Sequence, residues 1–233
     1  MGEESMETVE DRGDRVRLPA KQVAYDHIRR EVLFGEDGLE ARFLTEETIG
    51  SDLGLSRTPV REAFLRLEAE GLIKLVPNKG AVIPPITERD VREVMEVRSV
   101  LEEWAAREVC ESEESRCKVA TSLEALSVEM RRVGEAGEIA DFIDYDRVFH
   151  GEPIVATGNR VMHDIYGRLR DQQVRMGVHA VLTGQERVEA VCAEHAAMVE
   201  AYGSGDAERV CAAIEAHLAA TAGILYDRLG AAR

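Results

Sequence analysis

Four side chains in the second half of the sequence have the chemistry of transition-metal ligands. Asp146 and His150 are four residues apart, so they share one face if this stretch is helical. His195 and His217 lie in two later stretches whose apolar residues also follow a helical period. Three imidazoles and one carboxylate form a reasonable ligand set for a divalent metal, and presenting them from three helices would bury the ion inside a bundle. On spacing alone the plainer interpretation stays open, namely a surface Asp–His pair and two ordinary polar histidines.

A second group of side chains suits contact with nucleic acid. Arg57 and Arg61 are four residues apart, so both can lie on one side of the first turn of a helix. Arginine reads guanine O6 and N7 with two hydrogen bonds, and the hydroxyls of Ser56 and Thr58 suit phosphate oxygens. A recognition helix places such residues at its N-terminal end, where it enters the major groove. The alternative is an ordinary capped helix with a solvated basic face.

The elements around this motif favour DNA reading. Apolar spacing and capping residues predict three helices, which run from Val23 to a stop at Gly35, from a cap at Thr45 to Gly54, and from a cap at Thr58 to Gly71. Residues 36–43 are expected to form a loop. The basic motif therefore opens the third helix, only a few residues after the second helix ends.

A short β-hairpin is predicted after the third helix. Two extended runs, Leu72 to Val76 and Ala81 to Pro84, flank a turn that reads PNKG. Two helices, a tight turn, a third helix and a hairpin are the parts of a winged helix-turn-helix, with this turn as the tip of the wing. We expect Lys79 to contact a phosphate there and Gly80 to allow close approach of the backbone, beside Asn78.

Everything after residue 86 has the period of helices. Thr87 to Asp90 resembles a capping box, and further helices are expected at about 113–133, 138–156, 160–182, 186–203 and 206–229. Pro153 should kink or end the helix that carries His150. The predicted fold class is therefore mainly α, with an N-terminal winged helix-turn-helix that has a small β-hairpin wing, followed by an all-helical antiparallel bundle. The expected domains are a disordered tail (1–18), a DNA-binding domain (19–86) and the bundle (87–233).

The charge of the chain first argues against a nucleic-acid partner, because it is −16 over 233 residues. However, residues 87–233 hold 17 basic and 28 acidic residues, whereas residues 56–81 hold five basic and three acidic ones. A local positive face is therefore compatible with an acidic protein. No apolar run approaches the roughly 20 residues that span a bilayer. A missing secretory signal and four scattered cysteines complete the pattern of a cytoplasmic protein without a membrane partner.

The basic segment and its surroundings resemble the N-terminal domain of the GntR superfamily. The similarity lies in residues 55–67 (LSRTPVREAFLRL), then 70–73 (EGLI) and 77–81 (PNKGA). The resemblance implies DNA contacts from Ser56, Arg57, Thr58, Arg61, Asn78, Lys79 and Gly80. One departure is Glu47, which stands where many members carry an arginine that helps to hold DNA, and which weakens the expectation of a contact at this position.

Residues 87–233 resemble the all-helical C-terminal domain of the FadR subgroup, often called FCD. The matching pieces are VRxxLE at 97–102, DxxxH at 146–150 followed by GN at 158–159, EH at 194–195 and AHL at 216–218. The resemblance implies a pocket that holds a divalent metal and also receives an effector. Its ligands would be Asp146, His150, His195 and His217, and zinc is the first choice of metal, with nickel, manganese or iron as alternatives.

Two further residues are candidates for contact with an effector in that pocket. Arg98 could pair with an effector carboxylate, with a salt bridge inside the domain as the alternative. Asn159 could add a polar contact, with capping of the next helix as the alternative. His163 and His179 are additional histidines that we expect not to be ligands.

Together these features predict a ligand-responsive transcription regulator, with repression as the expected mode. A homodimer would bind a palindromic operator on double-stranded DNA, because a two-fold protein matches a two-fold site. The metal-containing pocket would sense a small organic acid. A metal-dependent hydrolase is one alternative, and Glu194 is its nearest candidate for a general base. A purely structural metal is the other.

Overall fold

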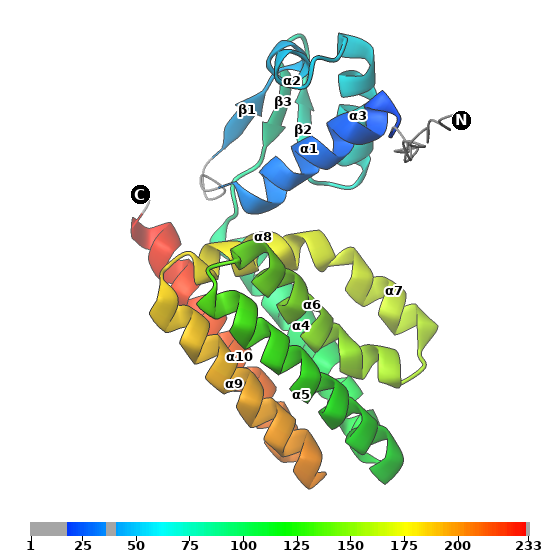
Figure 1. Ribbon diagram of the computed structural model, residues 1–233, viewed down its shortest axis with the longest axis vertical. Helices are drawn as coiled ribbons and strands as arrows, with labels where there is room; N and C mark the ends of the chain where they lie inside the picture. The colour runs from blue at the N-terminus through cyan, green and yellow to red at the C-terminus, as the bar shows by residue number, and fades with distance from the viewer. Residues whose placement is uncertain (1–17, 36–40, 232–233) are drawn as a thin grey trace, which may run out of the picture.

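The computed structural model describes residues 18–35 and 41–231 of the chain. The expected tail therefore lies outside the described residues except for Leu18, and so do residues 36–40 of the expected loop. The elements follow in the order α1 (Ala20–Phe34), β1 (Arg42–Leu44), α2 (Glu46–Leu53), α3 (Arg57–Ala69), β2 (Lys74–Val76), β3 (Gly80–Ile83), α4 (Glu88–Cys110), α5 (Glu113–Glu135), α6 (Ile139–Ala156), α7 (Arg160–Arg168), α8 (Arg170–Val181), α9 (Gln185–Ser204) and α10 (Ala207–Ala231) (Figure 1). This order confirms the predicted class, a winged helix-turn-helix followed by a helical bundle.

The helix-turn-helix forms where local signals require it. Thr45 caps α2, because its side chain accepts a hydrogen bond from the backbone N–H of Thr48 at 3.1 Å. Gly54 then ends α2 in the left-handed region, with φ of 62°. Buried apolar side chains of α1 and α3 form the core of this half of the molecule. They include Ala24, Ile28, Val32, Val60, Phe64 and Leu67.

The predicted cap of α3 is wrong. Ser56 precedes the helix as its N-cap, without a capping bond from its side chain, and Thr58 lies inside the first turn. The misplaced start has a simple reason in Pro59. A proline is tolerated throughout the first turn, since none of the first four N–H groups has an intrahelical partner, so it does not mark a single starting residue.

The sheet has three strands rather than the two of the predicted hairpin. β3 lies in the middle and pairs antiparallel with both β1 and β2, in the order β1-β3-β2. β1 comes from the stretch that we expected to be a loop, and its register places Phe43 opposite Val82. Three residues are too few to show an alternating pattern in the sequence. The strand forms because the free edge of β3 offers unpaired backbone groups.

Helices α4 to α10 form the bundle. In Figure 1, α4, α5, α6, α9 and α10 run side by side, and α5 packs against α6 and α9 while α10 packs against α4. α8 crosses the end of the bundle nearest to α1, and it contacts that helix. The capping box predicted at the start of α4 is present, with Thr87 and Asp90 bonded reciprocally. None of the helices in the described part of the chain is long and apolar enough to cross a membrane.

One expectation for the bundle helices needs correction, and one alternative for Pro153 is ruled out. The helix expected over 160–182 is two helices, because the chain breaks at Leu169 between α7 and α8. Pro153 does not end α6 early, since the helix continues to Ala156. Burial explains this tolerance: Pro153 and Ile154 are both buried against the bundle, and that packing offsets the hydrogen bond that proline cannot donate.

Gly80 stands where the wing meets β1. Its φ of 104° lies in a region that L-residues with a Cβ rarely adopt. A Cβ at this position would also collide with the carbonyl oxygen of Leu44. The fold therefore requires glycine here, whatever Gly80 does at DNA.

Gly80→Ala should destabilise the protein by about 2 kcal/mol or more, because backbone strain and a collision with backbone atoms add together. Gly71→Ala is the matched control. Gly71 also has a positive φ, of 77°, but open space surrounds its Cα, so only the strain of about 1–2 kcal/mol applies. Thermal or urea unfolding measures both variants, and equal losses would contradict the collision.

Candidate metal centre and nucleic-acid interface

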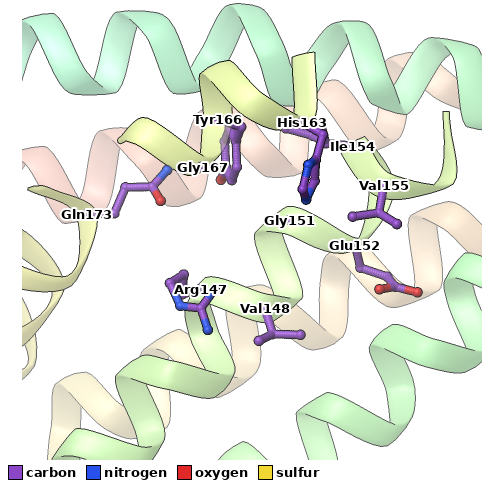
Figure 2. A pocket seen from close by; sticks show the side chains of 10 residues that line it. All are labelled: Arg147, Val148, Gly151, Glu152, Ile154, Val155, His163, Tyr166, Gly167 and Gln173. Atoms are coloured by element: carbon purple, nitrogen blue, oxygen red, sulfur yellow. The ribbon is translucent and has the colours of Figure 1, made fainter. Parts of the chain in front are cut away.

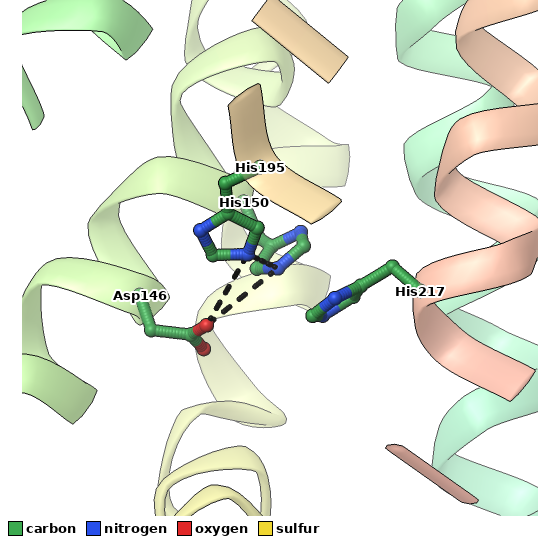
Figure 3. Close-up of side chains that lie close together, drawn as sticks. All are labelled: Asp146, His150, His195 and His217. Carbon is green, nitrogen blue, oxygen red and sulfur yellow. Dashed lines mark hydrogen bonds and ion pairs between the residues drawn. The ribbon is translucent and has the colours of Figure 1, made fainter. Parts of the chain in front are cut away.

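The four predicted metal ligands meet inside the bundle (Figure 3). Asp146 and His150 come from successive turns of α6, His195 from α9 and His217 from α10, and their ligand atoms all lie within 4.8 Å of one another. His195 Nε2 is 3.2 Å from His150 Nε2 and 3.5 Å from Asp146 Oδ1. The side chains of the three histidines are at most 3% exposed, and that of Asp146 is 20% exposed.

A buried carboxylate holds His150 in place. Glu102 Oε2 lies 2.9 Å from His150 Nδ1, while Oε1 accepts hydrogen bonds from Arg98 Nε at 2.8 Å and from the Tyr166 hydroxyl at 2.7 Å. Burial on its own would raise the pKa of Glu102, but Arg98 and His150 bring that pKa well below its usual range. The ionised carboxylate therefore accepts the Nδ1–H of His150, which leaves the Nε2 lone pair directed into the cluster.

A second carboxylate does the same for His217. Glu194 Oε2 is 2.7 Å from His217 Nδ1. Arg187 donates to both oxygens of Glu194, at 2.5 and 3.2 Å, and to the Thr221 hydroxyl at 2.9 Å. Burial opposes ionisation of Glu194, but the bonds from His217 and Arg187 outweigh it and lower the pKa of the carboxyl. A carboxylate held in this way is a poor general base, so its position does not support the hydrolase alternative.

His195 packs against an aromatic ring, and its Nδ1 has no carboxylate partner among the described residues. Its ring stacks on Phe149, with the centroids 4.1 Å apart and the planes 7° apart. Burial, and then the neighbouring His217 and His150, take the pKa of His195 well below its ordinary value. The ring is therefore neutral, and its Nδ1 is a buried atom without a hydrogen-bond partner among the described residues.

This donor set fits a divalent transition metal. One carboxylate and three imidazole nitrogens are ligand types that zinc, nickel, manganese and iron accept, and all three rings present Nε2 inward. A bound metal would supply a fixed positive charge among donors that otherwise face one another. His163, exposed on α7, and His179, buried on α8, are not members of the cluster.

A small cavity of about 20 Å³ adjoins the cluster. This is room for about one water molecule. Asp146, His217, Arg98, Arg187 and Thr221 are among the residues that line it. The position of Arg98 is therefore compatible with both of its expected roles. It forms the internal salt bridge through Nε, and it lines the space in which the sequence placed an effector.

Asn159 lies at the surface between α6 and α7. Its side chain accepts the backbone N–H of Met162 at 3.2 Å and so caps α7, which is the alternative that the sequence left open. An effector contact from Asn159 stays a prediction. A larger cavity, of about 160 Å³, lies between α6 and α7 (Figure 2). Its walls include Arg147, Tyr166 and Gln173, and Gln173 also lines the small cavity beside the cluster.

The predicted DNA-reading side chains lie at the surface around the start of α3. Ser56, Arg57, Thr58 and Arg61 are all exposed. Arg57 Nη2 lies 3.3 Å from Glu47 Oε2 of α2, with both side chains largely in solvent. Such an exposed pair contributes little to stability. It does, however, place a carboxylate beside an arginine expected to read DNA, so Glu47 competes with the phosphates and bases for Arg57.

The predicted wing residues lie at the turn between β2 and β3. Asn78 and Lys79 are exposed, and Asn78 has a left-handed φ of 59°. The turn closes with a hydrogen bond from the Lys79 N–H to the Val76 carbonyl oxygen at 3.0 Å. Gly80 is half-buried, and the contact with β1 described above accounts for it.

Sequence reasoning missed the supports of the histidines. Nothing in the spacing pairs Glu102 with His150, because the two residues are 48 positions apart and meet only in the tertiary structure. The one available signal was Arg98 and Glu102 at i, i+4, which predicts an ion pair on one helix face. Glu194 was noticed only for its place next to His195, whereas its actual partner is His217 on the following helix.

Residues 20–83 match the family described as bacterial regulatory proteins, gntR family, and residues 93–220 match the FCD domain. A protein of Paenarthrobacter nicotinovorans named "Probable D-xylose utilization operon transcriptional repressor" is 30% identical over 196 residues, or 84% of each chain. The gluconate operon transcriptional repressor of Bacillus subtilis is 31% identical over 154 residues, or 64% of this chain and 59% of that one. The structure of E. coli McbR/YncC has the same fold, with a TM-score of 0.70 at 19% identity over 91% of this chain and 99% of that one.

Glu102→Gln and Glu194→Gln should each weaken zinc affinity by about 10–100-fold, because an amide no longer accepts and polarises the Nδ1–H of its histidine as a carboxylate does. Glu208→Gln is the control, since Glu208 is 80% exposed on α10. Competition with a chromophoric chelator measures the affinity, and circular dichroism checks the fold. Unchanged zinc affinity in a folded Glu194→Gln protein would show that the carboxylate does not serve the ligand.

Proposed function

This chain belongs to the GntR family of bacterial regulatory proteins and carries an FCD domain, and from that premise we propose that it is a ligand-responsive repressor. Like its relatives, it is a transcriptional regulator and not an enzyme. Residues 19–86 bind DNA, and residues 87–233 bind the effector and form a homodimer. The convergence of four metal-ligand side chains beside a cavity lined by buried arginines carries the proposal.

Operator binding rests on the N-terminal end of α3 and on the wing. Arg57 and Arg61 read base edges, Ser56 and Thr58 bind phosphates, and Asn78, Lys79 and Gly80 bring the wing to the backbone of the duplex. Because one such domain offers few cations, specific affinity requires two of them. A homodimer on a palindromic operator supplies both copies. Binding to chromosomal DNA places the protein in the cytoplasm.

Repression is the mode favoured by the names of the relatives, since the two described above are named as a probable repressor of a D-xylose utilization operon and as a repressor of a gluconate operon. Under this proposal the free protein occupies its operator, and the effector releases it. The coupling free energy between the two sites is reciprocal. DNA must therefore weaken effector binding by the same factor by which the effector weakens DNA binding.

The cluster of Asp146, His150, His195 and His217 holds a divalent metal, with zinc as the first choice. When bound, the metal supplies a Lewis-acidic positive charge that attracts a carboxylate. Arg98 adds a second cationic group on the wall of the same cavity, next to Asp146 and His217. A small organic acid is therefore the class of effector that this cavity fits best. A purely structural metal is the competing proposal, in which chelation would unfold the bundle without changing any response.

The double variant Arg57→Ala, Arg61→Ala should lose at least about 10-fold in affinity for the fragment upstream of its own gene, because each good arginine–guanine pair contributes about 1–3 kcal/mol. Glu47→Gln should strengthen binding, since it frees Arg57. Arg89→Ala, which removes an exposed pair on α4, is the control. Fluorescence anisotropy at several salt concentrations measures these affinities. Wild-type affinity in the double variant would refute the assignment.

Zinc at about 100 times its dissociation constant should stabilise the chelator-treated protein by about 2.7 kcal/mol. His195→Ala should abolish this gain, because it removes one ligand of the cluster. Gluconate added to the zinc-loaded protein should raise the melting temperature further, whereas D-xylose, which carries no carboxylate, should not. Scanning fluorimetry together with elemental analysis decides the matter. A larger shift from the neutral sugar than from the acid would overturn the carboxylate assignment.

A further inference from the structure

Helix α8 has one face on the small cavity and another toward the DNA-binding half. Among the residues that line the cavity, α8 contributes Gln173, Met176, Gly177, Ala180 and Val181. The helix lies across the end of the bundle, below α1 in the view of Figure 1, and packs against both α1 and α6. It therefore stands between the proposed effector site and the domain that binds the operator.

Among the described residues, an ion pair and a hydrogen bond join the outer face of α8 to the DNA-binding half, in addition to its packing against α1. Asp171 forms an ion pair with Arg29 of α1. Arg175 Nη2 donates a hydrogen bond to the carbonyl oxygen of Pro84, in the segment between β3 and α4, at 2.9 Å. α1 in turn packs along α3. A displacement of α8 would therefore reach the recognition helix through α1.

The cavity must enlarge before it can hold an organic ligand, because its volume of about 20 Å³ is that of about one water molecule. Three of its walls, α6, α9 and α10, carry the metal ligands, and Glu102 and Glu194 tie two of the histidines in place. α8 carries none of the four clustered residues, and it begins directly after the break at Leu169. α4 also lines the cavity, but its Glu102 is bonded to His150, so α8 is the wall that we expect a ligand to displace.

Gly177 sets how closely α8 approaches α6. A Cβ on Gly177 would lie 3.2 Å from Ile143 Cδ1, which is tighter than ordinary van der Waals contact. Packed interiors compress little, so any group inserted between these two helices pushes them apart. A side chain placed at residue 177 would act in this way without any ligand.

We propose that α8 couples the cavity to the DNA-binding domain. A ligand in the cavity displaces α8 from α6, and the Arg29–Asp171 pair and the Arg175–Pro84 hydrogen bond carry that displacement to α1 and to the linker. The inference rests on the proposed function, since it explains how an effector among the metal-binding helices lowers operator affinity. The larger cavity in Figure 2 adjoins the small one, because Gln173 of α8 lines both spaces.

The test replaces the ligand by a side chain in the full-length protein. Gly177→Leu should weaken binding to the upstream fragment by about five-fold or more, the lower end of usual allosteric coupling. In the Asp171→Asn background the same substitution should have a much smaller effect, because one of the two links is broken. Ile143→Val removes the Cδ1 atom nearest to the inserted side chain, so it should restore part of the lost affinity.

Gly223→Leu is the matched control, because Gly223 is exposed on α10 with open space around it. Should Gly177→Leu fail to fold, Ala180→Leu inserts a side chain into the same cavity from the next turn of α8. Unchanged affinity for the upstream fragment in folded Gly177→Leu or Ala180→Leu protein overturns the coupling. An equal loss of that affinity with and without Asp171 overturns it too. If the wild-type protein does not bind the upstream fragment, the proposed function is refuted instead.

Discussion

The burial of charge inside the helical bundle is the constraint on which the rest of this structure depends. Arg98, Glu102, Arg187 and the three clustered histidines are all buried, and an unpaired charge in such a place costs several kcal/mol. The structure meets this cost with two parallel chains of contacts, Arg98 to Glu102 to His150 and Arg187 to Glu194 to His217. Each chain neutralises its own charges and fixes an imidazole with Nε2 directed inward. The arrangement that makes burial tolerable therefore also orients the candidate metal ligands.

The same constraint explains why so little empty space remains beside the cluster. Helices α4, α6, α9 and α10 must stand close enough for these hydrogen bonds to form, which leaves a cavity of about 20 Å³ beside the cluster. A site this small can respond to a ligand only by moving a wall. α8 carries no member of the cluster and touches both α6 and α1, so its position gives a local change in the cavity a path to the DNA-binding domain.

The net charge of the protein, −16, opposes the approach of the DNA-binding half to phosphates. One of the exposed cations of this half, Arg57, is engaged by Glu47 of the neighbouring helix. Glu47 can reduce non-specific binding, because phosphates must compete with it for the same guanidinium. Under the proposed function, affinity then depends on the correct bases and on the second copy of the domain, which suits a repressor that must leave its operator readily.

The sequence by itself determined most of the helices, apart from the start of α3 and the break at Leu169, together with the tight turn before α3 and the candidate ligands of the metal cluster. These features depend on neighbours within a few residues, such as the Thr45 cap, Gly54 in its left-handed conformation, and Asp146 and His150 on one helix face. The tertiary structure decided what lies far apart in the chain. Strand β1 forms only because β3 offers an edge, and Glu102 reaches His150 only because α4 packs against α6. Local propensity acts through adjacent residues, whereas the partners of buried charges depend on how the helices pack, which no spacing along the chain records.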